Sequence, residues 1–160
     1  MRRFVLALVL SCLAGPASAQ SWHYEDVGTP IAYLDNGRAQ IQFACRGGDL
    51  AFGYWVRAPH RSVAGASSMN LAITPDPTGS VSSTAGASFA QEIPLIHSDG
   101  SSMIIRGPVA QSWARIAQKA KTTIRLAYVR KQGAVEIFDS NDFSAKGSSA
   151  AIRRVLDRCG

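Results

Sequence analysis

The 160-residue chain is poor in charge, and this shortage excludes several classes of protein. Charged residues make up 18% of the sequence, below the roughly 25% that is usual for soluble domains, while hydrophobic residues make up 46%. A chain of this composition is not disordered, collagenous or a coiled coil. The sequence has few Glu and Lys residues and contains 14 Gly, and this composition argues against a helical bundle. The length fits one domain and leaves no room for two ordinary ones.

Sequence motifs for catalysis, metal binding and nucleic-acid recognition are also missing. There is no Cys-x-x-Cys pair, no Gly-x-Ser-x-Gly elbow, no zinc knuckle and no RNA-recognition motif. His97 and Asp99 would need a serine and a special geometry to form a triad, and they are better explained as a strand end and a turn. His23, Glu25 and Asp26 offer too few ligands for zinc. We therefore predict no catalytic residue, no metal site, no cofactor and no nucleic-acid partner.

Only one hydrophobic run is long, and it stands at the N-terminus. Two arginines precede the apolar residues 4–13, which are too few to cross a bilayer. The Ala-Ser-Ala sequence that ends at Ala19 matches a signal-peptidase site. We predict a cleaved signal peptide, residues 1–19, and one β-rich domain, residues 20–160, in the periplasm or secreted. The alternatives are a buried N-terminal helix and a lipoprotein signal with lipidation at Cys12.

Basic residues exceed acidic ones, and part of the excess is local. The formal net charge is +6, and Arg2 and Arg3 contribute two charges that leave with the predicted signal. Between Gly100 and Ala134 there are seven basic residues and no acidic one. Such a run suits an anionic lipid, lipopolysaccharide or an acidic partner, or it is the solvated face of a helix and a strand.

Alternation of apolar and polar residues predicts an antiparallel β-fold. It is clearest over residues 39–45, where the alternate residues up to Cys45 share one face, and it recurs over residues 50–57. Asp-Asn-Gly at 35–37 predicts a hairpin turn before the first of these strands. Residues 20–28 form a strand or a loop. The other expected strands are 29–34, 69–73, 93–97, 103–106, 122–131 and 135–138.

Helical spacing replaces alternation in two segments. Val109, Trp113 and Ile116 recur on one face of a predicted helix over 108–120, with Pro108 at its start. A second helix is expected over 149–158. We predict a mainly β, α+β domain, an antiparallel β-sandwich or partly open barrel of about seven or eight strands, with both helices packed on it.

Two cysteines, Cys45 and Cys159, remain after the predicted cleavage. The strand pattern places Cys45 on the core face, and the helix pattern places Cys159 on the face that packs. An even number of cysteines in an oxidising compartment predicts a disulfide between them. Two free thiols or a metal pair are the alternatives.

An aromatic residue beside cations marks the predicted contact surface. Trp55 and Arg57 lie on the strand face opposite the one that carries Tyr54. The face of Trp55 is either exposed to a ligand or covered by the first predicted helix. Two basic residues four apart on that helix oppose each other slightly and can mark a binding face. The predicted binding residues are Trp55, Arg57, His60, Arg61, Arg115, Lys119 and Arg125.

Three segments give the chain a resemblance to known proteins: AQIQFAC, GGDLAFGYWV and FSAKGSSAAIRRVLDRCG. A strand that ends in cysteine, a hairpin, and a Gly-Ser start to a helix that ends in cysteine resemble small secreted bacterial proteins related to invasion-associated locus B proteins and to the type VI secretion accessory protein VasI. The resemblance covers residues 39–56 and 143–160. It implies a periplasmic or secreted accessory role and a disulfide, and it brings no catalytic residue.

Together these patterns predict a binding or accessory domain of the bacterial envelope without catalytic function. It would contact an envelope protein or an anionic envelope component. A small envelope hydrolase is one alternative. Another is an inhibitor of a secreted or envelope enzyme that acts through the polar loop 78–88.

Overall fold

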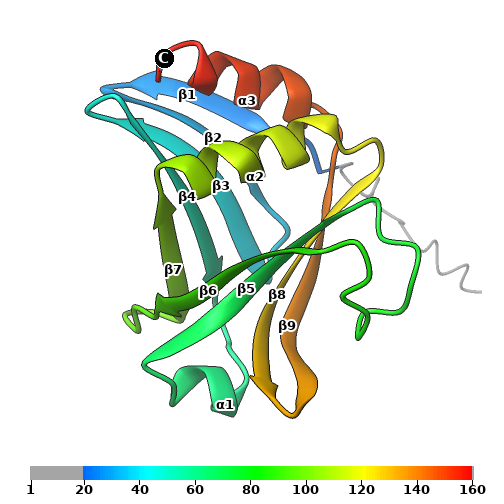
Figure 1. Cartoon of the computed structure of the whole chain (residues 1–160). Coiled ribbons are helices and arrows are strands. Elements are labelled where there is room, and N and C mark those ends of the chain that lie inside the picture. The colour runs from blue at the N-terminus through cyan, green and yellow to red at the C-terminus, as the bar shows by residue number, and fades with distance from the viewer. Residues whose placement is uncertain (1–19, 160) are drawn as a thin grey trace, which may run out of the picture.

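Two antiparallel sheets and three helices make up the computed structural model, which describes residues 20–159 (Figure 1). Sheet A has the strand order β1-β2-β3-β4-β7, sheet B has the order β6-β5-β8-β9, and neither closes into a barrel. The predicted antiparallel, mainly β fold is confirmed. The strands are β1 (His23–Val27), β2 (Thr29–Asp35), β3 (Ala39–Arg46), β4 (Asp49–Val56), β5 (Ser68–Pro75), β6 (Ser88–Pro94), β7 (Ser101–Arg106), β8 (Thr123–Gln132) and β9 (Ala134–Ser144).

Both predicted helices are present, and a third was not predicted. Helices α2 (Pro108–Lys119) and α3 (Ser148–Leu156) match the expected segments to within two residues at each end. Helix α1 (Arg61–Ala64) is a single turn, which is too short to produce a readable period.

The largest differences from the expected strand boundaries are at β6 and β9. β6 occupies residues 88–94 rather than 93–97, because its pairing with β5 is interrupted by a register shift and its Glu92 has a φ of 50°. Such a bulge breaks the alternation on which the prediction relied. β9 continues to Ser144, six residues beyond the predicted end, through a polar stretch that pairs with β8.

Helices α2 and α3 lie side by side across one end of the sheets (Figure 1). The hydroxyl of Ser148 in α3 donates to the carbonyl oxygen of Ala117 in α2 at 3.0 Å, and joins them. The ring of Trp113 in α2 meets that of Phe52 in β4, with centroids 5.1 Å apart. Helix α2 therefore packs on the face of sheet A to which Phe52 belongs.

Sheet B covers the rest of that same face. Tyr54 also points inward from β4, and its ring lies 5.1 Å from Tyr128 of β8 and 6.4 Å from Phe143 of β9. All three side chains are at most 1% exposed. The inner face of β4 thus contacts a helix near one end and the second sheet near the other, and a single core results.

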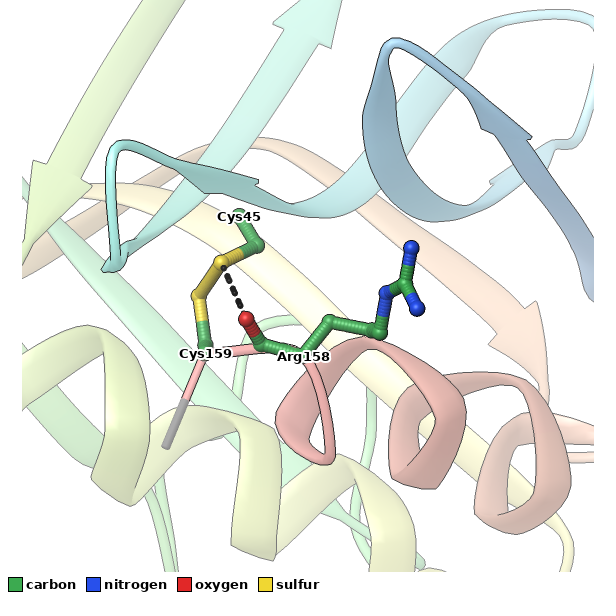
Figure 2. Close-up of a disulfide and its surroundings, with 3 residues drawn as sticks. All are labelled: Cys45, Arg158 and Cys159. Carbon is green, nitrogen blue, oxygen red and sulfur yellow. Dashed lines mark hydrogen bonds between the residues drawn. A yellow bond between two sulfur atoms is a disulfide. The ribbon is translucent and has the colours of Figure 1, made fainter.

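The disulfide fastens the C-terminal segment to sheet A (Figure 2). Cys45 near the end of β3 is bonded to Cys159, with the two Cα atoms 5.5 Å apart, as the facing of both residues predicted. The carbonyl oxygen of Arg158 lies 3.3 Å from the sulfur of Cys45. The bond closes a loop across a sequence separation of 114 residues.

The predicted signal peptide, residues 1–19, lies outside the described residues. Within residues 20–159, none of the helices has the length and apolar character needed to span a bilayer.

Candidate functional site

The outer face of sheet A is the candidate site, and strand alternation determines which side chains reach it. Phe52 and Tyr54 point inward to α2 and sheet B, so Gly53 and Trp55 point to the opposite face. Helix α2 therefore does not lie over Trp55, which is half-buried. The sequence left open whether the first predicted helix covers the face of Trp55, and in the structure it does not.

A shallow groove follows β4 along this face. In its first part, the side chains of β3 and β7 rise on either side of β4. From there the groove continues over Ala44 and Ala51 to Arg46 and Arg106. We call this feature the outer groove. The side chains that define its first part are Gln40 and Gln42 of β3, Gly53 and Trp55 of β4, and Ser102 and Ile104 of β7.

Gly53 creates the depression in the middle of the outer groove. It pairs with Gln42 on one side and with Ile104 on the other, so a residue without a side chain stands between two long ones. The Gln42 side chain lies across it, since a Cβ added to Gly53 would come within 2.8 Å of Gln42 Nε2. Any larger residue at position 53 would push Gln42 away and fill the groove.

Trp55 forms a fixed wall at one end of the outer groove. The Arg57 guanidinium lies 4.6 Å from the centre of its ring, within range for a cation–π contact. Asp35 accepts hydrogen bonds from both terminal nitrogens of Arg57, and this pairing lowers the pKa of the Asp35 carboxyl. The indole N–H is buried and has no partner among residues 20–159. The backbone of Gly100 covers it, because a Cβ there would lie 2.7 Å from Trp55 Nε1.

The two ends of the outer groove carry opposite charges. Asp99, in the turn before β7, lies at the Trp55 end. Arg46 and Arg106 lie at the other end, and both are exposed. Neither arginine has a carboxylate of residues 20–159 within ion-pair distance. Ile104, on the groove wall, is 44% exposed. The groove therefore offers apolar surface, amide groups and two available guanidinium groups.

The other predicted binding residues do not join this surface. His60 packs against Phe138 with tilted rings whose centroids lie 5.2 Å apart, and its Nδ1 accepts the backbone N–H of Ser62 at the start of α1. Arg61 is exposed on the same short helix. Helix α1 lies at the end of the molecule opposite α2 (Figure 1). Arg115 and Lys119, both exposed on α2, are therefore remote from His60 and Arg61.

Arg125 is placed inside the structure rather than on the surface. It is 7% exposed and forms a two-point ion pair with Asp142, with N–O distances of 2.6 and 2.9 Å. Its remaining guanidinium nitrogen donates to the carbonyl oxygens of Gly79 and Ser80. The prediction of a surface contact at Arg125 does not fit this burial: the residue ties the loop after β5 to sheet B.

The same contacts fix the base of the polar loop, residues 78–88 in the sequence-based prediction. The connection between β5 and β6 projects beside the sheets, in green in Figure 1. Val81 stands out on it with 60% exposure. Arg125 anchors the base of this loop at Gly79 and Ser80, and an inhibitory role for the loop stays a prediction.

His97 is engaged in a hydrogen-bonded pair with a serine, but without a carboxylate partner. Its Nδ1 lies 2.8 Å from Ser101 Oγ, and its Nε2 lies 2.8 Å from the carbonyl oxygen of Ala66. A carbonyl oxygen only accepts, so Nε2 carries the proton and Ser101 donates to Nδ1. Asp99 does not orient the ring. Ser101 is also completely buried, so a substrate cannot reach its hydroxyl.

The residues of the weighed metal patch are used in other contacts. His23 stacks on Tyr33, whose hydroxyl donates to Glu25 at 2.7 Å. Asp26 lies 3.4 Å from the guanidinium of Arg158. Within the described part of the chain, no three His, Cys, Asp or Glu residues are grouped so as to hold a metal ion.

Several residues of the outer groove were not among the predicted binding residues. Gln40 and Gln42 could have been found, because alternation already places them on the polar face of their strand. Ser102, Ile104 and Arg106 could not, because β7 reaches β4 only after two intervening strands of the other sheet.

No protein-family model matches the chain, and no match was found among curated proteins or solved structures.

Proposed function

We propose that this protein is a binding domain of the bacterial envelope, located in the periplasm or secreted, and that it holds an anionic envelope component in the outer groove. The observation that carries the proposal is the composition of this groove. A half-buried indole, an exposed isoleucine and two arginines without a carboxylate partner in residues 20–159 share one sheet face. Exposed apolar surface beside cationic groups is typical of sites that bind partners.

The proposed location is supported by the N-terminal sequence and by the disulfide. The signal-like segment ends at Ala19, and a disulfide between Cys45 and Cys159 persists in an oxidising compartment. The resemblance to secreted accessory proteins agrees with this location. If the proposal is right, protein recovered from the periplasm or medium after expression of the full-length sequence will begin at Gln20 by mass spectrometry. Recovery of uncleaved protein in the cytoplasm would contradict it.

A blocking variant tests the binding role. We expect Gly53→Leu to fill the outer groove while leaving the core intact, because position 53 points to the outer face. The matched control is Ala134→Leu, which adds the same side chain at an exposed position at the start of β9. Immobilised wild-type protein and Ala134→Leu should retain the same anionic component from a solubilised Gram-negative envelope.

Folded Gly53→Leu should lose that component. Circular dichroism and thermal unfolding establish that the variant is folded. Retention of the component by folded Gly53→Leu would place binding elsewhere and overturn the proposal for this face.

A further inference from the structure

We infer that the ligand of the outer groove is a linear saccharide that carries carboxylate groups. This inference rests on the proposed function, since it names the chemical class of the component that the groove holds. It follows from the side chains that line the groove, from the pairing of the strands beneath it, and from the two arginines at one end.

The lining matches the surface of a sugar chain. A sugar ring presents C–H groups on its faces and hydroxyl groups at its edges. The indole of Trp55 supplies an apolar surface with little conformational freedom to lose. Gln40 and Gln42 carry amides, which both donate and accept, as hydroxyl groups do. Asp99 adds a carboxylate that accepts from hydroxyl groups. One linear groove thus combines an aromatic wall with amide and carboxylate partners.

The pairing of the strands disfavours an extended peptide in the same groove. β4 is paired with β3 on one side and with β7 on the other, so the backbone groups of its floor are already used. A peptide strand binds well where it adds to a free sheet edge. A peptide lying over Ala51 and Gly53 would instead place an N–H and a C=O group of every residue over backbone that is already paired, and the Gln40 and Gln42 amides satisfy only a few of them. A saccharide instead carries its hydroxyl groups at the ring edges, toward the amides of Gln40 and Gln42, and presents C–H groups to the floor.

Two arginines at one end of the groove are the reason for inferring carboxylate groups on the saccharide. Arg46 and Arg106 line the far end of the groove and are exposed, and no carboxylate of residues 20–159 lies within ion-pair distance of either. A guanidinium group binds a carboxylate through two parallel hydrogen bonds. From Ala51 to Trp55 the floor of the groove extends about 13 Å, at about 3.3 Å per residue. An acidic group at the arginine end and sugar rings against Trp55 fit this length.

Isothermal titration calorimetry with three probes tests the inference. The probes are tetragalacturonate, an acidic linear saccharide; maltotetraose, a neutral one; and tetraglutamate, an acidic peptide. We expect tetragalacturonate to bind, and to bind at least about tenfold more tightly than the other two. Trp55→Ala, Gln42→Ala and Arg106→Gln should each weaken it by about tenfold. The controls Gln91→Ala and Lys131→Gln, at exposed positions of sheet B, should bind as the wild type does.

Each other outcome overturns the inference in a recognisable way. Absence of tetragalacturonate binding refutes the saccharide. Equal or tighter binding of tetraglutamate with the same dependence on Trp55 and Arg106 makes the ligand a peptide. Equal binding of maltotetraose removes the role of the arginines. In these cases the envelope retention experiment with Gly53→Leu still decides the proposed function separately. Gln42→Ala changes only a surface side chain, so the test does not depend on the folding of Trp55→Ala.

Discussion

The guanidinium of Arg57 lies 4.6 Å from the centre of the Trp55 ring, and Asp35 holds it there through both carboxylate oxygens. Asp35 ends β2, Trp55 lies in β4 and Arg57 directly follows β4, and β3 separates these two strands of sheet A. This arrangement explains why an exposed sheet face carries an indole in one orientation. Arg57 thereby positions the wall of the groove, and its own contact with a ligand stays a prediction.

Loss of this cation should loosen Trp55. In Arg57→Gln we expect acrylamide to quench tryptophan fluorescence more strongly, since Trp22 and Trp113 are only 7% and 2% exposed and contribute little. The pKa of Asp35 should rise toward its ordinary value, because the hydrogen bonds from Arg57 are the main cause that lowers it. Arg61→Gln, on α1, serves as the control. Unchanged quenching in Arg57→Gln would contradict the positioning role.

Substitution at Gly100 should be far more costly than at other turn glycines. A Cβ at Gly100 would lie 2.2 Å from the carbonyl oxygen of Val56, at a φ of 141°. We expect Gly100→Ala to lower the free energy of unfolding by about 3 kcal/mol, from steric overlap and backbone strain together.

The control for this prediction is Gly133→Ala. Its φ is also positive, at 77°, but nothing lies within 4 Å of the added Cβ. The cost there should be about 1 kcal/mol, from the left-handed conformation alone. Urea unfolding of both variants measures the difference, and equal effects would show that the packing of Gly100 on β4 is not as described.

Removal of the disulfide should destabilise the fold without changing its architecture. The bond constrains a long segment of the unfolded chain, and the chain-entropy account assigns such a loop at most about 4–5 kcal/mol. We expect Cys45→Ala with Cys159→Ala to lower the free energy of unfolding by about 2–4 kcal/mol. Reduction of the wild type with dithiothreitol should produce a similar change, which thermal unfolding measures. A loss below about 1 kcal/mol would contradict the role of the bond.

Asp76 should make stability depend on pH in the acid range. Its carboxylate accepts the backbone N–H groups of Lys121, Thr122 and Thr123 and the hydroxyl of Thr122, at 2.7 to 3.2 Å. These donors, with that of Lys121 first, hold the pKa of the Asp76 carboxyl well below its ordinary value. Because the folded-state pKa is the lower one, the stabilisation is complete above an unfolded pKa of about 4 and is lost as the pH falls further.

Two variants separate charge from backbone conformation at this position. Asp76→Ala should lower the free energy of unfolding at pH 7 by about 1–3 kcal/mol, because several donors lose their acceptor. Asp76→Asn should cost less, since Asn tolerates the φ of 44° and keeps one acceptor oxygen. The difference between wild type and Asp76→Ala should shrink as the pH falls below about 4. A constant difference from pH 7 to pH 3 would contradict this account.

Local patterns were sufficient for the parts of the fold that depend on neighbouring residues. The hairpin turn at 35–37 formed as expected, with Gly37 at a φ of 86° and Asn36 Oδ1 accepting the N–H of Ala39. The core-facing side of Cys45 and the apolar face of α3 were also predictable from the local sequence. The pairing of β4 with β7 was not, because it joins segments separated by strands of the other sheet.

The same distinction between local and long-range features applies to the candidate binding surface. The outward facing of Trp55 was predictable because strand alternation alone determines it. Arg125 was misplaced, because its burial depends on Asp142 and on loop carbonyl groups that are distant in the sequence. The outer groove needs Gly53 to stand between Gln42 and Ile104, and only the first of these neighbours is close in the chain.

Mapping of ligand contact by nuclear magnetic resonance tests the central claim most directly. A ¹⁵N-labelled sample would be titrated with the anionic envelope fraction that the wild type retains. We predict that the Gly53 and Ile104 backbone amides and the Gln42 side-chain amide shift, while the indole signal of the core residue Trp113 stays in place. Shifts confined to loop 78–88, or to the face of α2 that carries Arg115, would contradict a binding site on the outer face of sheet A.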